Sequence, residues 1–384
     1  MTHSEQILLS LVRKSLFGYE ETFPSDTDWD AVLQEAKAQS IVGITSKALP
    51  SDVPSSVLLE WNKLAYAQLA NTIRYWKAQD ELHQLLTENS ISYVILKGAA
   101  AAMLYPDPFS RAMGDIDFLV ASDQFDRAKE LLEGNGYKIC HEGNDRHICF
   151  SKDRVSYELH RRFSYDDLDM EDILQAAIPH AELHQAAGHE FCTFPARENG
   201  LVLLAHLWNH LHTGVGLRQV LDWMLFVKGY ATDEFWNTQF FDLAKQCHLE
   251  KTAIVAACMC RKYFKLPVHI TWCHSAEEEL CDELMETVLE YGNFGRKVSN
   301  NKAEVKAQIA LTGFSRYGIF RHLQNRGEIN WTAYHSHPWL RPFAWLYQLF
   351  RYVVLWLTSP KNQKITSLIQ KETKTNNLLK RLSS

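Results

Sequence analysis

The 384-residue sequence has no excess of positive charge. It contains 40 lysines and arginines against 46 aspartates and glutamates, which gives a net charge of −6 at pH 7. Proteins that bind nucleic acid without specificity carry a clustered basic surface. We therefore expect no general nucleic-acid binding.

The chain also lacks paired cysteines at metal-binding or disulfide spacing. Its eight cysteines include no C-x-x-C pair. Cys258 and Cys260, separated by one residue on an apolar stretch, are expected to be packed thiols. The first 18 residues have neither a long apolar core nor a cleavage site, so they do not indicate a signal peptide. These features predict a protein of the reducing cytoplasm.

Two nucleotide-binding patterns are missing as well. There is no G-x-G-x-x-G and no Walker motif, which argues against dinucleotide-binding and P-loop enzymes. The hydrophobic content of 46% and the aromatic content of 12% are those of an ordinary folded protein. A chain of this length is long enough for two or three domains.

Periodicity divides the chain into four parts and a connector. Residues 1–90 are expected to be helices that pack on the core, and residues 91–165 alternate between strand and helix before three further strands. This order predicts an α+β fold with a mixed sheet. Residues 163–195 are predicted to be an irregular acidic connector, residues 196–335 a helical domain, and residues 336–384 an aromatic helix with a basic tail.

The central stretch, residues 91–120, contains the most informative pattern. Residues 92–96 form an apolar run of strand length, Lys97 and Gly98 interrupt it, and the alanines that follow favour a short helix. A second strand is expected over residues 115–120. Because side chains alternate along a strand, Asp115 and Asp117 are predicted to lie on one face.

A third carboxylate occurs on another predicted strand. Residues 155–160 alternate between apolar and polar side chains, which places Glu158 on the polar face. If this strand lies beside the aspartate strand, Asp115, Asp117 and Glu158 surround one or two Mg²⁺ ions. Such a site suits phosphoryl or nucleotidyl transfer.

The same residues resemble the uncharacterised nucleotidyltransferase family of the DNA polymerase β-like superfamily. The residues concerned are Lys97-Gly98-Ala99, Arg111, Gly114 to Asp117, and Glu158. The resemblance implies a mixed sheet flanked by helices, an Asp-x-Asp pair and a third acid that bind two Mg²⁺ ions, and a nucleoside triphosphate as substrate. It also implies that a helical domain beside the sheet helps to hold the acceptor.

One position departs from the superfamily pattern. Ala99 stands where the phosphate-binding turn has a serine, so phosphate contact would fall to Lys97 and to the backbone amides of Gly98 and Ala99. Lys97 could equally be a solvated charge at a strand end. Arg111 is expected either to meet a phosphate or to brace the loop by pairing with Asp107.

Several polar residues have open roles. His160 shares a face with Glu158. It either orients the Glu158 carboxylate or is simply a histidine at the rim of the site. His210, Arg218 and Asp222 either face the cleft or, for the last two, form a salt bridge within one helix. His206 and His210 have the spacing of a helical zinc site, but no third ligand is evident, and a structural role is the stronger interpretation.

The C-terminal part allows two interpretations. Residues 339–358 are apolar nearly all round, so they form either a buried helix that closes the helical domain or a helix on the cytoplasmic membrane face with a basic tail on anionic lipid. The buried helix is the preferred one, because aromatic residues are abundant throughout the chain.

The sequence as a whole predicts a Mg²⁺-dependent nucleotidyltransferase. It would transfer a nucleoside monophosphate from a nucleoside triphosphate to a hydroxyl or phosphate of a small molecule or protein, with release of pyrophosphate. The missing turn serine leaves an alternative, which is a catalytically inactive relative that serves as a binding or antitoxin-like partner.

Overall fold

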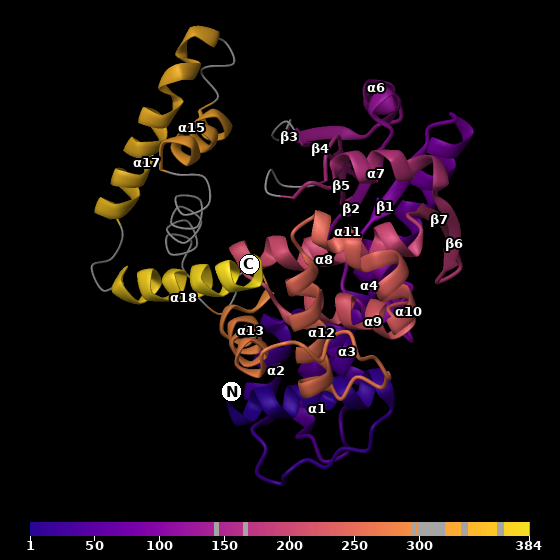
Figure 1. The fold of residues 1–384 in the computed structure, drawn as a ribbon, viewed down its shortest axis with the longest axis vertical. Coiled ribbons are helices and arrows are strands. Elements are labelled where there is room, and N and C mark those ends of the chain that lie inside the picture. The colour runs from indigo at the N-terminus through magenta and orange to yellow at the C-terminus, as the bar shows by residue number, and fades with distance from the viewer. Residues whose placement is uncertain are drawn as a thin grey trace.

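The computed structural model describes residues 1–141, 146–163, 168–293, 297, 319–331, 337–358 and 365–383. Within these residues a mixed sheet lies against a larger assembly of helices (Figure 1). The predicted α+β class is confirmed.

The N-terminal part is helical, as predicted. Its elements are α1 (His3–Phe17), α2 (Trp29–Ala38), α3 (Val42–Thr45), the 3₁₀ turn η1 (Ser46–Ala48) and α4 (Ser55–Glu88). Helix α1 begins with a capping box, in which the Thr2 hydroxyl accepts from the Glu5 amide and the Glu5 carboxylate accepts from the Thr2 amide. Gly18, with φ of 71°, ends this helix in the left-handed conformation.

The central sheet has the strand order β1-β2-β5-β4-β3. Its strands and the intervening helices are β1 (Tyr93–Leu96), α5 (Gly98–Ala102), the 3₁₀ turn η2 (Pro108–Ser110), β2 (Ile116–Val120), the 3₁₀ turn η3 (Ser122–Gln124), α6 (Phe125–Gly134), β3 (Lys138–His141), β4 (His147–Lys152) and β5 (Val155–His160). Strands β2 and β5 are parallel, and the other neighbours are antiparallel.

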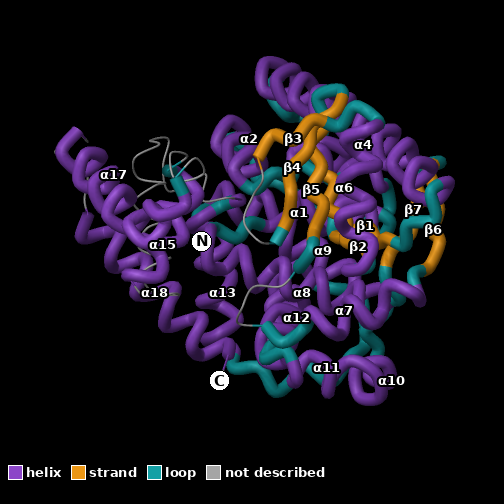
Figure 2. Tube along the Cα trace, turned by 90° about the horizontal axis from the view of Figure 1, so that it is seen from above, coloured by secondary structure: helices purple, strands orange, loops and turns teal. Residues whose placement is uncertain are grey.

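The predicted connector after the sheet is structured instead. Of its residues, 164–167 lie outside the described part, and the rest contain α7 (Glu171–Ala177), the 3₁₀ turn η4 (Ile178–His180) and a hairpin of β6 (Glu182–Ala186) and β7 (His189–Thr193). Strand β7 lies against β1 and α4, and the Thr193 hydroxyl donates to the Ile95 carbonyl at 2.9 Å. The prediction of an irregular connector was therefore wrong, because these contacts with residues far away in the sequence stabilise the short strands. Figure 2 shows the hairpin beyond the β1 edge of the sheet.

The second helical part follows the hairpin. It comprises α8 (Ala196–Thr213), α9 (Leu217–Gly229), α10 (Asp233–Phe235), the π-helical turn η5 (Trp236–Phe240), α11 (Phe241–Gln246), α12 (Glu250–Phe264) and α13 (Glu278–Tyr291). Helix α9 packs against α5, α8 and α12. This packing places α8 and α9 beside the sheet.

The C-terminal part differs from the preferred prediction. It contains α15 (Ile319–Asn330), the 3₁₀ segment η7 (Pro338–Phe343), α17 (Ala344–Thr358) and α18 (Ile365–Ser383). Helix α17 packs on α15, to one side of the other helices in Figure 1, and leaves Phe350 66% exposed. The expected buried helix over 339–358 was wrong, because among the described residues α15 and η7 cover only part of an apolar surface that runs nearly all round.

Helix α18 closes the helical part instead. Its Leu378, Leu379 and Leu382 are buried in the core, and its Lys374 and Arg381 form ion pairs with acidic residues of α13. Of the predicted basic tail, Lys361 and Lys364 lie outside the described residues. None of the described helices is long and apolar enough to cross a membrane. Binding of the C-terminal part to a membrane surface stays a prediction.

The two faces of the sheet contact different hydrophobic cores. One core contains Ile95, Phe118 and Tyr157 with the C-terminal half of α4, and the other contains Leu96 and Leu119 with α8 and α9. Helix α4, 34 residues long, contributes to both, through Trp61 to the helical core and through Trp76 to the sheet core. The sheet is thus held between two packed layers.

Candidate active site

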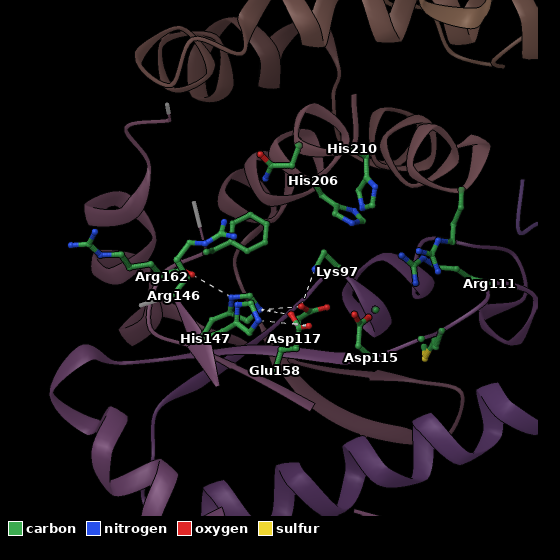
Figure 3. Close-up of a pocket in the computed structure, with 17 residues that line it drawn as sticks. Lys97, Arg111, Asp115, Asp117, Arg146, His147, Glu158, Arg162, His206 and His210 are labelled. Carbon is green, nitrogen blue, oxygen red and sulfur yellow. Dashed lines mark hydrogen bonds and ion pairs between the residues drawn. The ribbon is translucent and has the colours of Figure 1, made fainter. Parts of the chain in front are cut away.

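The three predicted acids lie on the face of the sheet that α8 and α9 cover. Asp117 is paired in register with Leu96 of β1 and with Glu158 of β5. Asp115 precedes β2 by one residue, and strand alternation places it on the same side as Asp117 (Figure 3). The predicted neighbourhood of the two acidic strands is therefore confirmed.

The alternation of β2 and β5 explains this register. Ile116 and Phe118 of β2, and Tyr157 and Leu159 of β5, point to the opposite face and are at most 2% exposed. A slip of one residue would turn carboxylates into that core and these apolar side chains into the pocket. Burial of the apolar side chains therefore holds the acids in place.

Lys97 connects the turn after β1 to the acids. Its Nζ lies 2.8 Å from Asp117 Oδ1, and the two side chains are only 15% and 1% exposed. Burial alone would lower the pKa of Lys97, but the charges of Asp117, Asp115 and Glu158 raise it above its usual range. The interpretation of Lys97 as a solvated strand-end charge was wrong.

This lysine also has a strained backbone. Its φ of 51° and ψ of −131° form a conformation that residues with a Cβ rarely adopt, and Gly98 follows with φ of 37°. Such a conformation costs about 1–3 kcal/mol. The ion pair with Asp117 offsets part of this cost and aims the ammonium group into the site.

His160 joins two of the acids. Its Nε2 lies 3.0 Å from Asp117 Oδ1 and 3.4 Å from Glu158 Oε2. Burial lowers the pKa of His160, but hydrogen bonds to these carboxylates outweigh the burial and raise it to about 9. His160 is consequently an imidazolium at neutral pH, and it contacts Glu158 directly rather than lying on the rim.

The acids differ in how their charge is compensated. Burial raises the pKa of Glu158, but the hydrogen bond from His160 and the charge of Lys97 lower it to about 2. The pKa of Asp115 is raised, first by the charge of Asp117 and then by burial. The environment of Asp115 therefore favours an added cation, whereas that of Glu158 already stabilises its charge.

Helix α8 provides the opposite wall with two histidines. The rings of His206 and His210 pack edge to face with centroids 4.6 Å apart, and both point toward the acids in Figure 3. Burial lowers the pKa of both, that of His210 to about 3, so both are neutral. Within the described part of the chain they belong to no group of three metal-ligating side chains, and His206 Nδ1 has no hydrogen-bond partner there.

Arg111 is bound to α9. Its Nε and Nη2 donate to the two carboxylate oxygens of Asp222 at 2.7 and 2.6 Å, and the Tyr105 hydroxyl donates to the same carboxylate at 2.8 Å. The predicted partner Asp107 pairs with Lys47 instead. Arg111 does brace the loop, but its partner comes from a helix more than 100 residues further along the chain, which local spacing does not reveal.

Arg218 and Asp222 have different positions. Arg218 lines the pocket and donates through Nη1 to the Ala112 carbonyl at 3.3 Å. Asp222 is 1% exposed, and its two oxygens accept from Arg111. The contact to Ala112 and the Arg111 pair both join α9 to the loop that precedes the aspartates.

Helix α4 holds the same loop from the other side. Gln68 donates to the Ser110 carbonyl at 2.9 Å, Asn71 to the Met113 carbonyl at 3.1 Å, and the Tyr75 hydroxyl to the Gly114 carbonyl at 2.6 Å. These residues were not identified in the sequence, although their near-helical spacing places them on one face of the helix. They fix the backbone directly before Asp115.

These elements enclose a pocket of about 250 Å³ between the sheet and α8–α9. Of the predicted residues, the pocket is lined by Lys97, Gly98, Arg111, Asp115, Asp117, Glu158, His160, His210 and Arg218. Ala99 and Asp222 do not line it. The Ala99 side chain is fully buried in the sheet core, so only its backbone could serve a ligand.

Gly114, named in the sequence motif, and His206, considered only as one of a histidine pair, also line the pocket. Other lining residues were missed, and they are Met113, Arg146, His147, Arg162, Phe163 and Asn209. Strand alternation offered a signal for His147, which lies opposite His160 in the register of β4 and β5. Arg146 and Arg162 follow no such pattern.

Comparison with known proteins agrees with this geometry. Residues 25–265 match the model of an uncharacterised nucleotidyltransferase family. The chain belongs to this family. Its membership confirms the resemblance stated for residues 97–158 and assigns the chain, at a coarse level, to the nucleotidyltransferases.

One solved structure similar to this family member is that of an antigenic nucleotidyltransferase-like protein from Paracoccidioides brasiliensis. The two share 14% sequence identity with a TM-score of 0.33, over 53% of this chain and 94% of the other. No curated protein matches the sequence.

Proposed function

We propose that the protein is a Mg²⁺-dependent nucleotidyltransferase that transfers a nucleoside monophosphate from a nucleoside triphosphate to a hydroxyl or phosphate acceptor and releases pyrophosphate. The observation that carries this proposal is the register of Asp117 with Glu158, with Asp115 on the same face. Family membership supports the reaction class.

The acids fit a hard divalent cation. Carboxylate oxygens are the ligands that Mg²⁺ prefers, and the raised pKa of Asp115 reflects repulsion from Asp117 that a cation would relieve. Asp115, Asp117 and Glu158 would together hold one or two metal ions. When bound, Mg²⁺ neutralises charge on the triphosphate and on the pyrophosphate that leaves.

The remaining pocket residues divide between binding and positioning. We assign phosphate contact to Lys97 and to the backbone of Gly98, because both line the pocket beside the acids. Arg218 adds positive charge from the opposite wall, and Arg111 holds the loop. One of the carboxylates is proposed to accept the proton of the attacking hydroxyl.

The acceptor is proposed to be a small molecule or a protein side chain that enters between the sheet and α8. The neutral imidazoles of His206 and His210 face this space and are suited to hydrogen-bond an uncharged hydroxyl. The eight free cysteines support a location in the reducing cytoplasm.

Two observations favour a second function. Lys97 and His160 already form ion pairs with Asp117, and Ala99 provides no hydroxyl at the turn. In an inactive relative that acts as a binding or antitoxin-like partner, the acids would be neutralised in this way by side chains of the protein itself, with no metal ion. Calorimetric titration separates the two functions, because the scaffold should bind neither Mg²⁺ nor nucleoside triphosphate.

The direct test is Asp117→Asn, assayed by pyrophosphate release from each of the four nucleoside triphosphates in the presence of cell extract. We expect turnover to fall by about 100-fold or more, since a charge that supports the transition state is lost. Asp115→Asn should have a similar effect without removing the Lys97 ion pair. Asp123→Asn, at an exposed position just after β2, is the matched control and should leave the rate unchanged. Equal rates for Asp117→Asn and the wild type would refute the proposal.

A further inference from the structure

A second set of metal-ligating side chains lies beside the three acids. His147 and Cys149 are two residues apart on β4, so their side chains point to the same face of the sheet. In the register of β4 with β5, His147 lies opposite His160 and Cys149 lies opposite Glu158. The topology therefore brings an H-x-C pair against an E-x-H pair.

The distances suit a single ion. One ligand atom each from His147, Cys149 and Glu158 lie within 4.8 Å of one another, and His147 Nε2 is 4.0 Å from Glu158 Oε1. Ligand atoms around a tetrahedral zinc ion are about 3.5 Å apart, given metal–ligand distances of about 2.0–2.3 Å. Small rotations of these half-buried side chains would bring the ligand atoms to the separation that a zinc ion requires.

The chemistry of this set differs from that of the acid site. Thiolate and imidazole ligands select zinc and similar ions, whereas Mg²⁺ prefers oxygen ligands only. Three protein ligands leave a fourth tetrahedral position for water or another ligand. Binding would release the thiol proton of Cys149 to solvent.

We propose that His147, Cys149 and Glu158 form a binding site for a thiophilic divalent cation such as Zn²⁺, distinct from the acid site and joined to it through Glu158. The two oxygens of Glu158 face different groups, since Oε1 lies toward His147 and Oε2 lies 3.4 Å from His160 Nε2. A zinc ion at this position draws on the carboxylate that the proposed Mg²⁺ site also uses. Zn²⁺ therefore weakens Mg²⁺ binding, and Mg²⁺ weakens Zn²⁺ binding by the same factor.

The test uses the full chain, freed of metal, titrated with Co²⁺ as a spectroscopic substitute for Zn²⁺. We expect a thiolate-to-cobalt charge-transfer band that Zn²⁺ abolishes. Cys149→Ser should remove the band, and His147→Ala should weaken Zn²⁺ binding, measured by competition with a chromophoric chelator, by about 100-fold, because even outer-shell changes cost about 10- to 100-fold.

Cys192→Ser is the matched control. Cys192 is also a half-buried free thiol, but it lies on β7, at the β1 edge of the sheet and away from β4. This variant should keep both the band and the affinity. Circular dichroism of each variant establishes that the chain is folded.

Asp115→Asn separates this site from the proposed reaction. It should remove pyrophosphate release but keep the cobalt band, because Asp115 is not among the three ligands. Absence of the band in the folded wild type, or its persistence in Cys149→Ser, would overturn the zinc site whatever the outcome for catalysis.

Discussion

The buried pair of Arg111 and Asp222 allows a quantitative prediction for Asp222→Asn. Two short hydrogen bonds, of 2.7 and 2.6 Å, join side chains that are only 3% and 1% exposed. Asparagine preserves the size of the side chain but removes its charge. The guanidinium of Arg111 would then be buried without a counter-ion.

The expected loss of stability is large. Two opposite unit charges about 4 Å apart attract by about 4 kcal/mol at an effective dielectric constant of about 20. Removal of one partner from a buried pair costs about 3–5 kcal/mol, because the remaining charge stays desolvated. We therefore expect Asp222→Asn to lower the free energy of unfolding by about 3–5 kcal/mol.

Urea denaturation at neutral pH, followed by circular dichroism, measures this change. An Arg111→Met, Asp222→Leu double variant should recover most of the loss, since it leaves no unpaired charge. Glu278→Gln is the control, because its pair with Lys262 is largely exposed and screened by solvent, so its loss should change the stability little. A loss below about 1 kcal/mol for Asp222→Asn, or a double variant as unstable as the single one, would refute the reasoning.

Two other predictions concern α8 and its surroundings. Burial lowers the pKa of His206 and His210 from 6.5, so below that pH the unfolded chain binds protons that the folded chain does not. The contribution of these two histidines to stability is thus complete above pH 6.5 and falls on acidification by about 1.4 kcal/mol per pH unit for each histidine. We expect His210→Gln to reduce the slope of stability against pH by that amount in urea titrations between about pH 6 and 5, and an unchanged slope would contradict the burial argument. A Cβ on Gly200 would lie 2.3 Å from the ring of Phe226, so Gly200→Ala should lower the free energy of unfolding by about 1–3 kcal/mol, which a lower thermal unfolding midpoint would reveal. Gly229→Ala, where a Cβ meets nothing within 4 Å, should not, and equal effects would show that the α8–α9 contact is adaptable.

The acid positions were predictable because they depend on local alternation. Ile116 and Phe118 are buried on one face of β2, and this requires Asp115 and Asp117 to share the other. The placement of Glu158 needed only one further assumption, that its strand lies next to β2, and the parallel register bears it out.

Other features depended on tertiary contacts that no local pattern reveals. Asp222 has a basic residue four positions before it, which suggests a pair within the helix, yet its carboxylate accepts two hydrogen bonds from Arg111. The β6–β7 hairpin forms in a polar stretch because β1 and α4 lie against it. Likewise, the exposure of Phe350 depends on which helix packs on α17.

The length of α4 has a consequence for how the pocket can open. Its 34 residues extend for about 51 Å, and its two halves are embedded in the layers that form the two walls. A hinge motion between these walls would require α4 to bend, or one of its ends to leave the core in which it is packed. Either change would expose a buried tryptophan side chain. Substrates should accordingly enter between walls of nearly constant separation, with the loop and side chains at the mouth, rather than whole layers, making the adjustments.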